Sequence, residues 1–324
     1  MDTCLVFNLA VHQPLSDYSF FDIGKAKDHF KAGTHAAQQV SYLKIILDKA
    51  DQGLHTNLCI SGVFIEALQS EEVLFNRLKQ AVAKKQLTLV GGTYHYSLAA
   101  LFSPSLFKDQ LHTHRALLHN LFKIEPQVFL HPSALYSNKM AVEIKNAGYS
   151  AAITESLNWY LGTQSPQQLF LSADESLRLL LHADHTSGES AGIKTVCIDA
   201  AQTEVDIAKQ IDDLALQHTL ISVEAAIEKY PATQKYRVPM PIGNAVARSY
   251  NYFTENAMQR DIMEKINFLL ERAAIKKEDW NDKLAPFTCL FYFKQMDNKH
   301  AGQNPYDSYI SFMNILSDLE LSKK

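Results

Sequence analysis

The stretch that decides the fold is QVFLHPSALYSNKMAVEIKNAGYSAAIT, residues 127–154. Its first apolar run, residues 127–133, predicts a buried strand, and the helical spacing of apolar residues over 138–147 predicts a helix. Gly148 suits the left-handed backbone position that often follows a helix. SAAIT at 150–154 then predicts a second strand. The stretch is one strand–helix–strand unit, which is the building block of a parallel sheet.

The same alternation continues on both sides of this unit. Further strands are predicted at 4–11, 54–62, 87–92, 177–182, 194–200 and 218–223, and further helices at 35–52, 71–85 and 104–122. Strands that alternate with helices predict a parallel α/β sheet or barrel, with functional residues at the carboxyl ends of the strands. After about residue 240 the strand signals stop, and 245–274 and 304–321 predict long helices. We therefore expect a barrel over residues 1–240 and a helical region over 241–324.

Composition limits the classes of function. The 324 residues are 47% hydrophobic and 20% charged, as in globular proteins. The net charge of -4 argues against nucleic acid or an anionic membrane surface as the main partner. No apolar run reaches the ~18 residues of a membrane span. The four cysteines are isolated in apolar stretches, which indicates buried thiols in a reducing compartment. We expect a cytoplasmic protein without a cofactor, and the oligomeric state stays open.

Polar and aromatic residues follow two of the predicted strands. His12 and Gln13 come after the first strand, and Tyr94 and His95 follow the Gly91–Gly92 pair after the third. Sugar rings have apolar faces and hydroxyl groups, so they bind to sites that combine aromatic rings with hydrogen-bonding groups. The alternative for each segment is an ordinary turn that packs its own side chains.

Asp199 ends another apolar run, where barrel enzymes commonly place catalytic carboxylates. It could equally cap the next helix. A weak metal candidate is His182 with Asp184 and His185, whereas His112 and His114 point to different sides of a helix. Motifs for nucleotide binding or zinc proteolysis do not occur in the sequence.

Several motifs in a fixed order resemble one enzyme family. They are HQP (12–14), YSFFDIG (18–24), CISGVFIEAL (59–68), GGTYHYSLAALFS (91–103), VFLHPSALYS (128–137), AITESLNWYLGTQSPQQLF (152–170), NAMQRD (256–261) and NPYDSYISFMNIL (304–316). Together they resemble glycoside hydrolase family 57, in its α-amylase-like branch. The resemblance implies an α/β fold, a (β/α)7-type parallel barrel with a helical C-terminal region packed over the barrel mouth.

The resemblance also implies a retaining mechanism on α-glucans, which needs two carboxyl groups ~5–5.5 Å apart. The family's acid/base aspartate matches Asp199. Its nucleophile glutamate falls on Ser133 when Tyr136-Ser137 sets the register, and residues 129–140 contain no carboxylate. Ala201 stands at the place of a companion glutamate, and Leu290 at that of an aspartate.

These departures predict a degenerate homologue that binds an α-glucan or maltooligosaccharide, with hydrolysis lost or greatly reduced. A serine hydroxyl without a base is a poor nucleophile. The expected substrate-binding residues are His12, Gln13, Tyr94, His95, His131 and Glu155.

Three alternatives remain open. His131 could activate Ser133, because residues i and i+2 share a strand face. Glu155 could pair with Asp199 in an active hydrolase. A metal-dependent enzyme on the same kind of barrel is the third.

Overall fold

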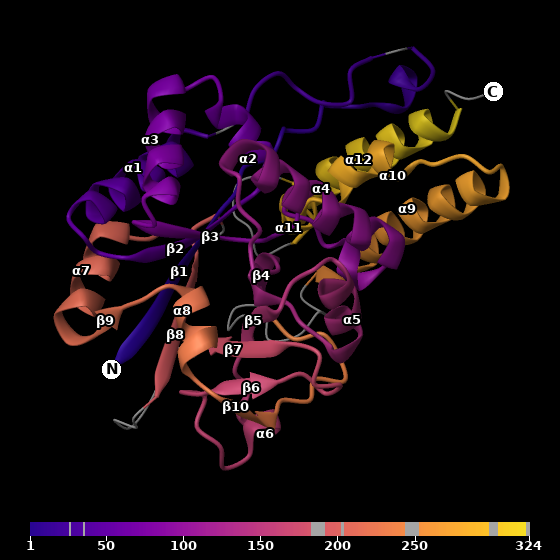
Figure 1. The fold of residues 1–324 in the computed structure, drawn as a ribbon. Coiled ribbons are helices and arrows are strands. Elements are labelled where there is room, and N and C mark those ends of the chain that lie inside the picture. The colour runs from indigo at the N-terminus through magenta and orange to yellow at the C-terminus, as the bar shows by residue number, and fades with distance from the viewer. Residues whose placement is uncertain are drawn as a thin grey trace.

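The computed structural model describes residues 1–25, 27–34, 36–182, 192–201, 204–243, 253–297 and 304–321. Seven parallel strands form an almost closed barrel (Figure 1). Around the barrel they are β1 (Asp2–Leu9), β2 (Thr56–Ile60), β3 (Leu87–Val90), β4 (Val128–Leu130), β5 (Ala151–Glu155), β7 (Arg178–His182) and β8 (Ile193–Asp199). β8 pairs with β1 in parallel over seven residue pairs, which brings the last strand back to the first.

Two seams complete the barrel. Between β3 and β4, the Gly91 N–H donates to the Val128 carbonyl (2.9 Å), and the Gly91 carbonyl accepts from the Leu130 N–H (2.8 Å). A Cβ atom on Gly91 would lie 2.3 Å from the Tyr149 ring, so only glycine fits the seam. Between β7 and β8, the paired residues are His182 and Thr195.

Apolar side chains fill the barrel, and a short helix closes its amino end. The interior cluster includes Cys4, Val6, Cys59, Val90, Val128, Leu130, Ala151, Ile153, Leu180 and Ile193, with Val223, Ala226 and Ile227 from α8 (Val223–Lys229). The buried Asn57 amide donates to the Ile221 carbonyl (3.1 Å) and accepts from the Val223 N–H (2.8 Å). Because the amino end is plugged, the carboxyl ends of the strands are left for a site.

Helices and short strands surround the barrel. The helices are α1 (Ala37–Asp51), α2 (Gly62–Leu68), α3 (Glu72–Ala83), α4 (Pro104–Phe122), α5 (Asn138–Asn146), α6 (Asn158–Leu161) and α7 (Ile207–Gln217). Outside the barrel, β6 (Leu169–Leu171) pairs antiparallel with β7, β10 (Ala232–Lys235) pairs with β6, and β9 (Thr219–Leu220) pairs with β1.

The C-terminal region is helical and lies beside α4 (Figure 1). It contains α9 (Ala257–Ile275), α10 (Asn281–Leu284), α11 (Leu290–Gln295) and α12 (Pro305–Leu321). Its backbone bonds to the loop after β3, where the Leu98 N–H donates to the Thr288 carbonyl (2.8 Å) and the Leu290 N–H to the Tyr96 carbonyl (3.0 Å). This region therefore borders the carboxyl ends of the strands.

The predicted seven-stranded barrel with a C-terminal helical region is confirmed, with small shifts in element bounds. The run predicted as a strand at 218–223 is only the two-residue β9, because the Ser222 hydroxyl accepts from the Ala225 N–H (2.9 Å) and caps α8. The helix predicted from 245 begins at Ala257, and residues 244–252 lie outside the described part. Within the described residues, every helix is too short or too polar to cross a membrane.

Candidate active site at the barrel mouth

Asp199 occupies the centre of the candidate site. It is the last residue of β8, and it shares a strand face with Thr195 and Cys197. Its Oδ2 accepts a hydrogen bond from the Tyr96 hydroxyl (2.6 Å) and one from the Ser133 backbone N–H (3.2 Å). The structure thus brings together Asp199 and Ser133, two residues 66 positions apart in the chain.

A strained turn delivers Ser133 to this place. β4 ends at Leu130, and residues Pro132–Ala134 form a 3-10 turn. Ser133 (φ 56°) and Ala134 (φ 50°) both adopt left-handed backbone conformations, which cost about 1 kcal/mol or more each for residues other than glycine. Both residues are buried, and Asp199 holds the turn by accepting the Ser133 N–H.

His131 is buried against aromatic rings. Its Nδ1 donates to the Pro132 carbonyl (2.8 Å), and its ring packs against Phe107 and Phe129. Burial lowers the pKa of His131 to about 4, so the ring is neutral at physiological pH. Nε2 has no hydrogen-bond partner among the described residues, so His131 is not hydrogen-bonded to the Ser133 hydroxyl.

Glu155 ends β5 and is buried, with 4% of its surface exposed. It pairs in register with His182, and His182 pairs with Thr195 of β8. Asp199 lies four residues beyond Thr195, a distance of ~13 Å along the strand. The backbones of Glu155 and Asp199 are therefore offset by much more than the ~5–5.5 Å that separates the carboxyl groups of a retaining pair.

His12 and Gln13 meet the C-terminal region. The His12 ring stacks on Phe291 at 4.5 Å between ring centroids, and the edge of Tyr292 lies at 5.7 Å. The Gln13 side chain is exposed, and its backbone carbonyl accepts from the Tyr292 hydroxyl (2.7 Å). These contacts join the loop after β1 to α11.

Tyr94 and His95 face the surrounding helices. The Tyr94 ring lies against Gly62 at the start of α2, and burial together with a hydrogen bond to Glu66 raises the pKa of its phenol. The His95 N–H donates to the Gln110 side chain of α4 (2.8 Å), and burial lowers the pKa of His95 to about 4. Their described contacts do not include Asp199.

Three further residues, Tyr96, Phe291 and Lys294, belong to the surroundings of Asp199. Tyr96, in a left-handed conformation (φ 54°), hydrogen-bonds to Asp199, and its ring lies 5.2 Å from that of Phe291. Burial lowers the pKa of the Lys294 ammonium, and the negative charges of Asp199 and Asp297 oppose that shift. The aromatic triplet at 94–96 was the signal for Tyr96. Nothing in the local sequence points to Phe291 or Lys294.

The remaining expectations concern metals and replaced acids. Among the described residues, no three His, Cys, Asp or Glu side chains are grouped so that they could hold a metal ion. Asp184 and His185 lie outside the described residues. Leu290, which we expected at the place of a family aspartate, is fully buried, and the Ala201 N–H donates to the Asn8 carbonyl (3.1 Å).

Comparisons with known proteins bear on the family and the fold. The model of glycosyl hydrolase family 57 matches residues 7–194. A putative alpha-amylase from Methanocaldococcus jannaschii is 31% identical over 141 residues. That alignment covers 43% of this chain and 30% of the relative, so the chain matches less than a third of that protein's length.

Two solved structures share the fold. A GH57 branching enzyme from Thermococcus kodakaraensis superposes with a TM-score of 0.66 at 9% identity, covering 97% of this chain and 88% of that one. The alpha-amylase AmyC from Thermotoga maritima gives a TM-score of 0.62 at 10% identity, covering 100% and 95%. At these identities the structures support the fold, and the family model covers more than half of the sequence. The chain belongs to glycosyl hydrolase family 57.

Proposed function

We propose that this chain binds α-glucan chains at the barrel mouth and has lost most or all hydrolase activity. The observation that carries the proposal is the contact between Asp199 and the backbone of Ser133. A carboxylate at residue 133 would project from a backbone that already touches the acid/base candidate. The chain has a serine there instead.

The loss of that carboxylate removes the covalent step of a retaining mechanism. A serine hydroxyl needs a base to attack a sugar carbon. His131 is not placed as that base, because its Nδ1 donates to the Pro132 carbonyl and its ring packs against Phe107 and Phe129. Asp199 alone cannot form the covalent intermediate of that mechanism.

Glucan binding has support from the groups that remain. His12 and Phe291 are partly exposed rings beside the buried Tyr96, and the exposed parts of such rings are surfaces on which sugar faces stack. Asp199, partly exposed at the end of β8, offers a carboxylate to sugar hydroxyls, whereas Glu155 at the end of β5 is buried. The solved branching enzyme and amylase of the same fold are named for activities on such chains.

A second candidate is an active hydrolase that uses Glu155 with Asp199. The observation in its favour is that Glu155 is buried at the carboxyl end of a barrel strand. Because the backbones of Glu155 and Asp199 are offset along the strands, we expect their carboxyl groups to lie farther apart than those of a retaining pair. A separation of ~6.5–9.5 Å would give products with inverted configuration.

Calorimetric titration with maltoheptaose tests the binding proposal. We expect saturable heat with maltoheptaose and none with a β-linked glucose oligosaccharide of equal length, because the two chains present their hydroxyls in different directions. The Asp199→Asn variant separates the two candidates: it leaves binding of the same order under the leading proposal, whereas it abolishes turnover under the second. A flat titration of the wild-type protein with maltoheptaose would contradict the proposed function.

A further inference from the structure

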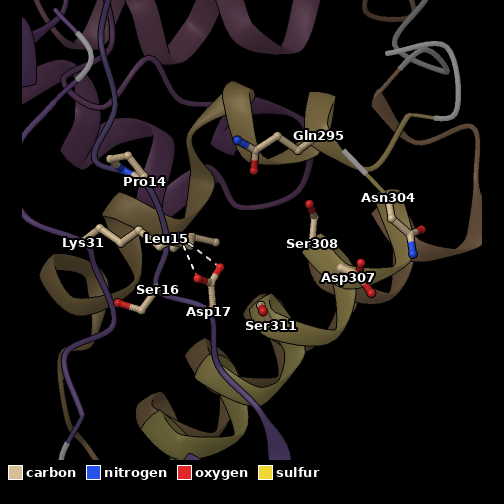
Figure 2. A pocket seen from close by; sticks show the side chains of 10 residues that line it. All are labelled: Pro14, Leu15, Ser16, Asp17, Lys31, Gln295, Asn304, Asp307, Ser308 and Ser311. Carbon is tan, nitrogen blue, oxygen red and sulfur yellow. Dashed lines mark hydrogen bonds and ion pairs between the residues drawn. The ribbon is translucent and has the colours of Figure 1, made fainter. Parts of the chain in front are cut away.

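A polar pocket of about 230 Å³ lies between the loop after β1 and the start of α12 (Figure 2). One wall consists of residues 14–17 with Lys31, and the other consists of α12 with Gln295 of α11. The lining residues are Pro14, Leu15, Ser16, Asp17, Lys31, Gln295, Asn304, Asp307, Ser308 and Ser311.

Hydrogen bonds fix the loop that forms the first wall and fasten this loop to α12. The Ser16 N–H donates to the His29 carbonyl (2.9 Å), and the Lys31 N–H donates to the Pro14 carbonyl (2.8 Å). The loop is fastened to α12 because the Tyr18 N–H donates to the Ser311 hydroxyl (3.2 Å). The pocket is therefore a formed feature of the fold.

The chemistry of the lining fits a neutral polyhydroxylated ligand. Hydroxyl, amide, carboxylate and ammonium groups are all present, and sugar hydroxyls can both donate to and accept from such groups. The Lys31 ammonium pairs with the Asp17 carboxylate (2.9 Å), so Asp307 alone adds an unbalanced formal charge to the lining. A strongly charged ligand would find little electrostatic attraction here. Pro14 and Leu15 supply a small apolar surface.

Both walls of the pocket lie close in the chain to residues beside the candidate active site. Pro14 lies two residues after His12, and Gln295 lies one helical turn after Phe291, on the same side of α11. His12 and Phe291 stack on each other, and Phe291 packs on Tyr96, which hydrogen-bonds to Asp199. A glucan that extends from the barrel mouth past the partly exposed His12 and Phe291 would be directed towards Pro14 and Gln295 in the pocket.

We propose that this pocket is an outlying subsite that takes one glucose unit of an α-glucan, several units away from Asp199. The inference rests on the proposed function, because it needs a glucan at the barrel mouth. Its effect is on chain length: long oligosaccharides contact both places, whereas short ones contact only the mouth.

The Ser308→Trp variant fills the pocket and tests the proposal by calorimetry. We expect the affinity for maltoheptaose to fall about tenfold, as when two or three hydrogen bonds are lost, while the affinity for maltotriose changes less than about twofold. The matched control is Ile310→Trp, which places the same side chain on an exposed position of α12 outside the pocket. The double variant Gln295→Ala, Ser308→Ala removes hydrogen-bonding groups without adding bulk, so it gives the same test if Ser308→Trp does not fold.

The possible results separate this inference from the function on which it rests. If the wild-type protein binds neither oligosaccharide, the proposed function is wrong and the subsite fails with it. If the wild-type protein binds both, and neither pocket variant weakens maltoheptaose more than Ile310→Trp does, the pocket is not a subsite. An equal loss for maltotriose and maltoheptaose would also overturn the inference.

Discussion

At the scale of single residues, Asp199 acts as a hydrogen-bond acceptor. One of its carboxylate oxygens receives both the Tyr96 hydroxyl and the Ser133 N–H. Hydrogen bonds to a charged acceptor are stronger than those between neutral groups. Tyr96 and Ser133 adopt left-handed backbone conformations, which are strained for residues other than glycine. The two hydrogen bonds to Asp199 help to stabilise these conformations.

The Tyr96→Phe variant tests this network. We expect it to lower the free energy of unfolding by about 1–2 kcal/mol, because it removes a hydroxyl that donates to a carboxylate. Chemical denaturation at neutral pH measures the change. Tyr136→Phe is the matched control, since Tyr136 is equally buried and its hydroxyl has no hydrogen-bond partner among the described residues. Equal stability losses in the two variants would contradict the network.

His131 predicts a pH dependence of stability. Burial lowers its pKa in the folded state to about 4, below the ordinary value of 6.5. The unfolded chain therefore takes up the proton first, and stability is lost as the pH falls from about 6.5 towards 4. We expect His131→Gln to reduce the loss of stability between pH 7 and pH 5 by roughly 1–2 kcal/mol.

Urea denaturation at the two pH values measures this difference. His112→Gln is the matched control, because it makes the same replacement at an exposed position on α4. A His131→Gln variant with the pH dependence of the wild-type protein would show that this ring is not a buried neutral group.

At the scale of elements, the turn after β3 fixes the geometry of the site. The Gly92 N–H donates to the His114 Nδ1 (3.0 Å), and the His114 Nε2 donates to the Ile60 carbonyl (2.7 Å). A single buried histidine of α4 thus joins the ends of β2 and β3. The loop that carries Tyr96 starts at this junction. Through His114, α4 therefore helps to position that loop and the Tyr96 hydroxyl.

Gly91→Ala tests the seam between β3 and β4. The added methyl group would lie 2.3 Å from the Tyr149 ring, so we expect a loss of about 2–3 kcal/mol in unfolding free energy. Denaturant titration of Gly91→Ala, Tyr149→Ala and the double variant checks the cause. If the clash is responsible, the double variant loses less stability than the sum of the single ones. If the stability losses of the two single variants add up to that of the double variant, the loss in Gly91→Ala arises from the backbone and not from the clash.

The sequence could predict most elements but only part of the site. Apolar periodicity and Gly148, which adopts φ +92°, were enough to predict the strand–helix–strand unit at 127–154. Periodicity could not show that Tyr96 reaches Asp199, while Tyr94 and His95 pack against α2 and α4. That choice depends on a positive φ at Tyr96 and on contacts with α11, nearly 200 residues later in the chain. Long-range contacts of this kind leave no local pattern.

At the scale of the whole molecule, the barrel and the C-terminal region share apolar packing. One core cluster contains Phe129 and Leu179 from barrel strands together with Ile266 of α9 and Phe312 of α12. We propose that the boundary near residue 240 separates two kinds of secondary structure around a joint core. The barrel mouth then lies where the two parts meet, next to the backbone bonds between residues 96–98 and 288–290.

The release of reducing sugar from maltoheptaose, followed over days at neutral pH, tests the central claim most directly. The sample must be one in which calorimetry shows that the glucan is bound. Because we propose that Ser133 stands at the place of the nucleophile, we predict no release above that of the Asp199→Asn variant. Steady release by the wild-type protein that disappears in Asp199→Asn would contradict the claim and establish a working carboxylate pair.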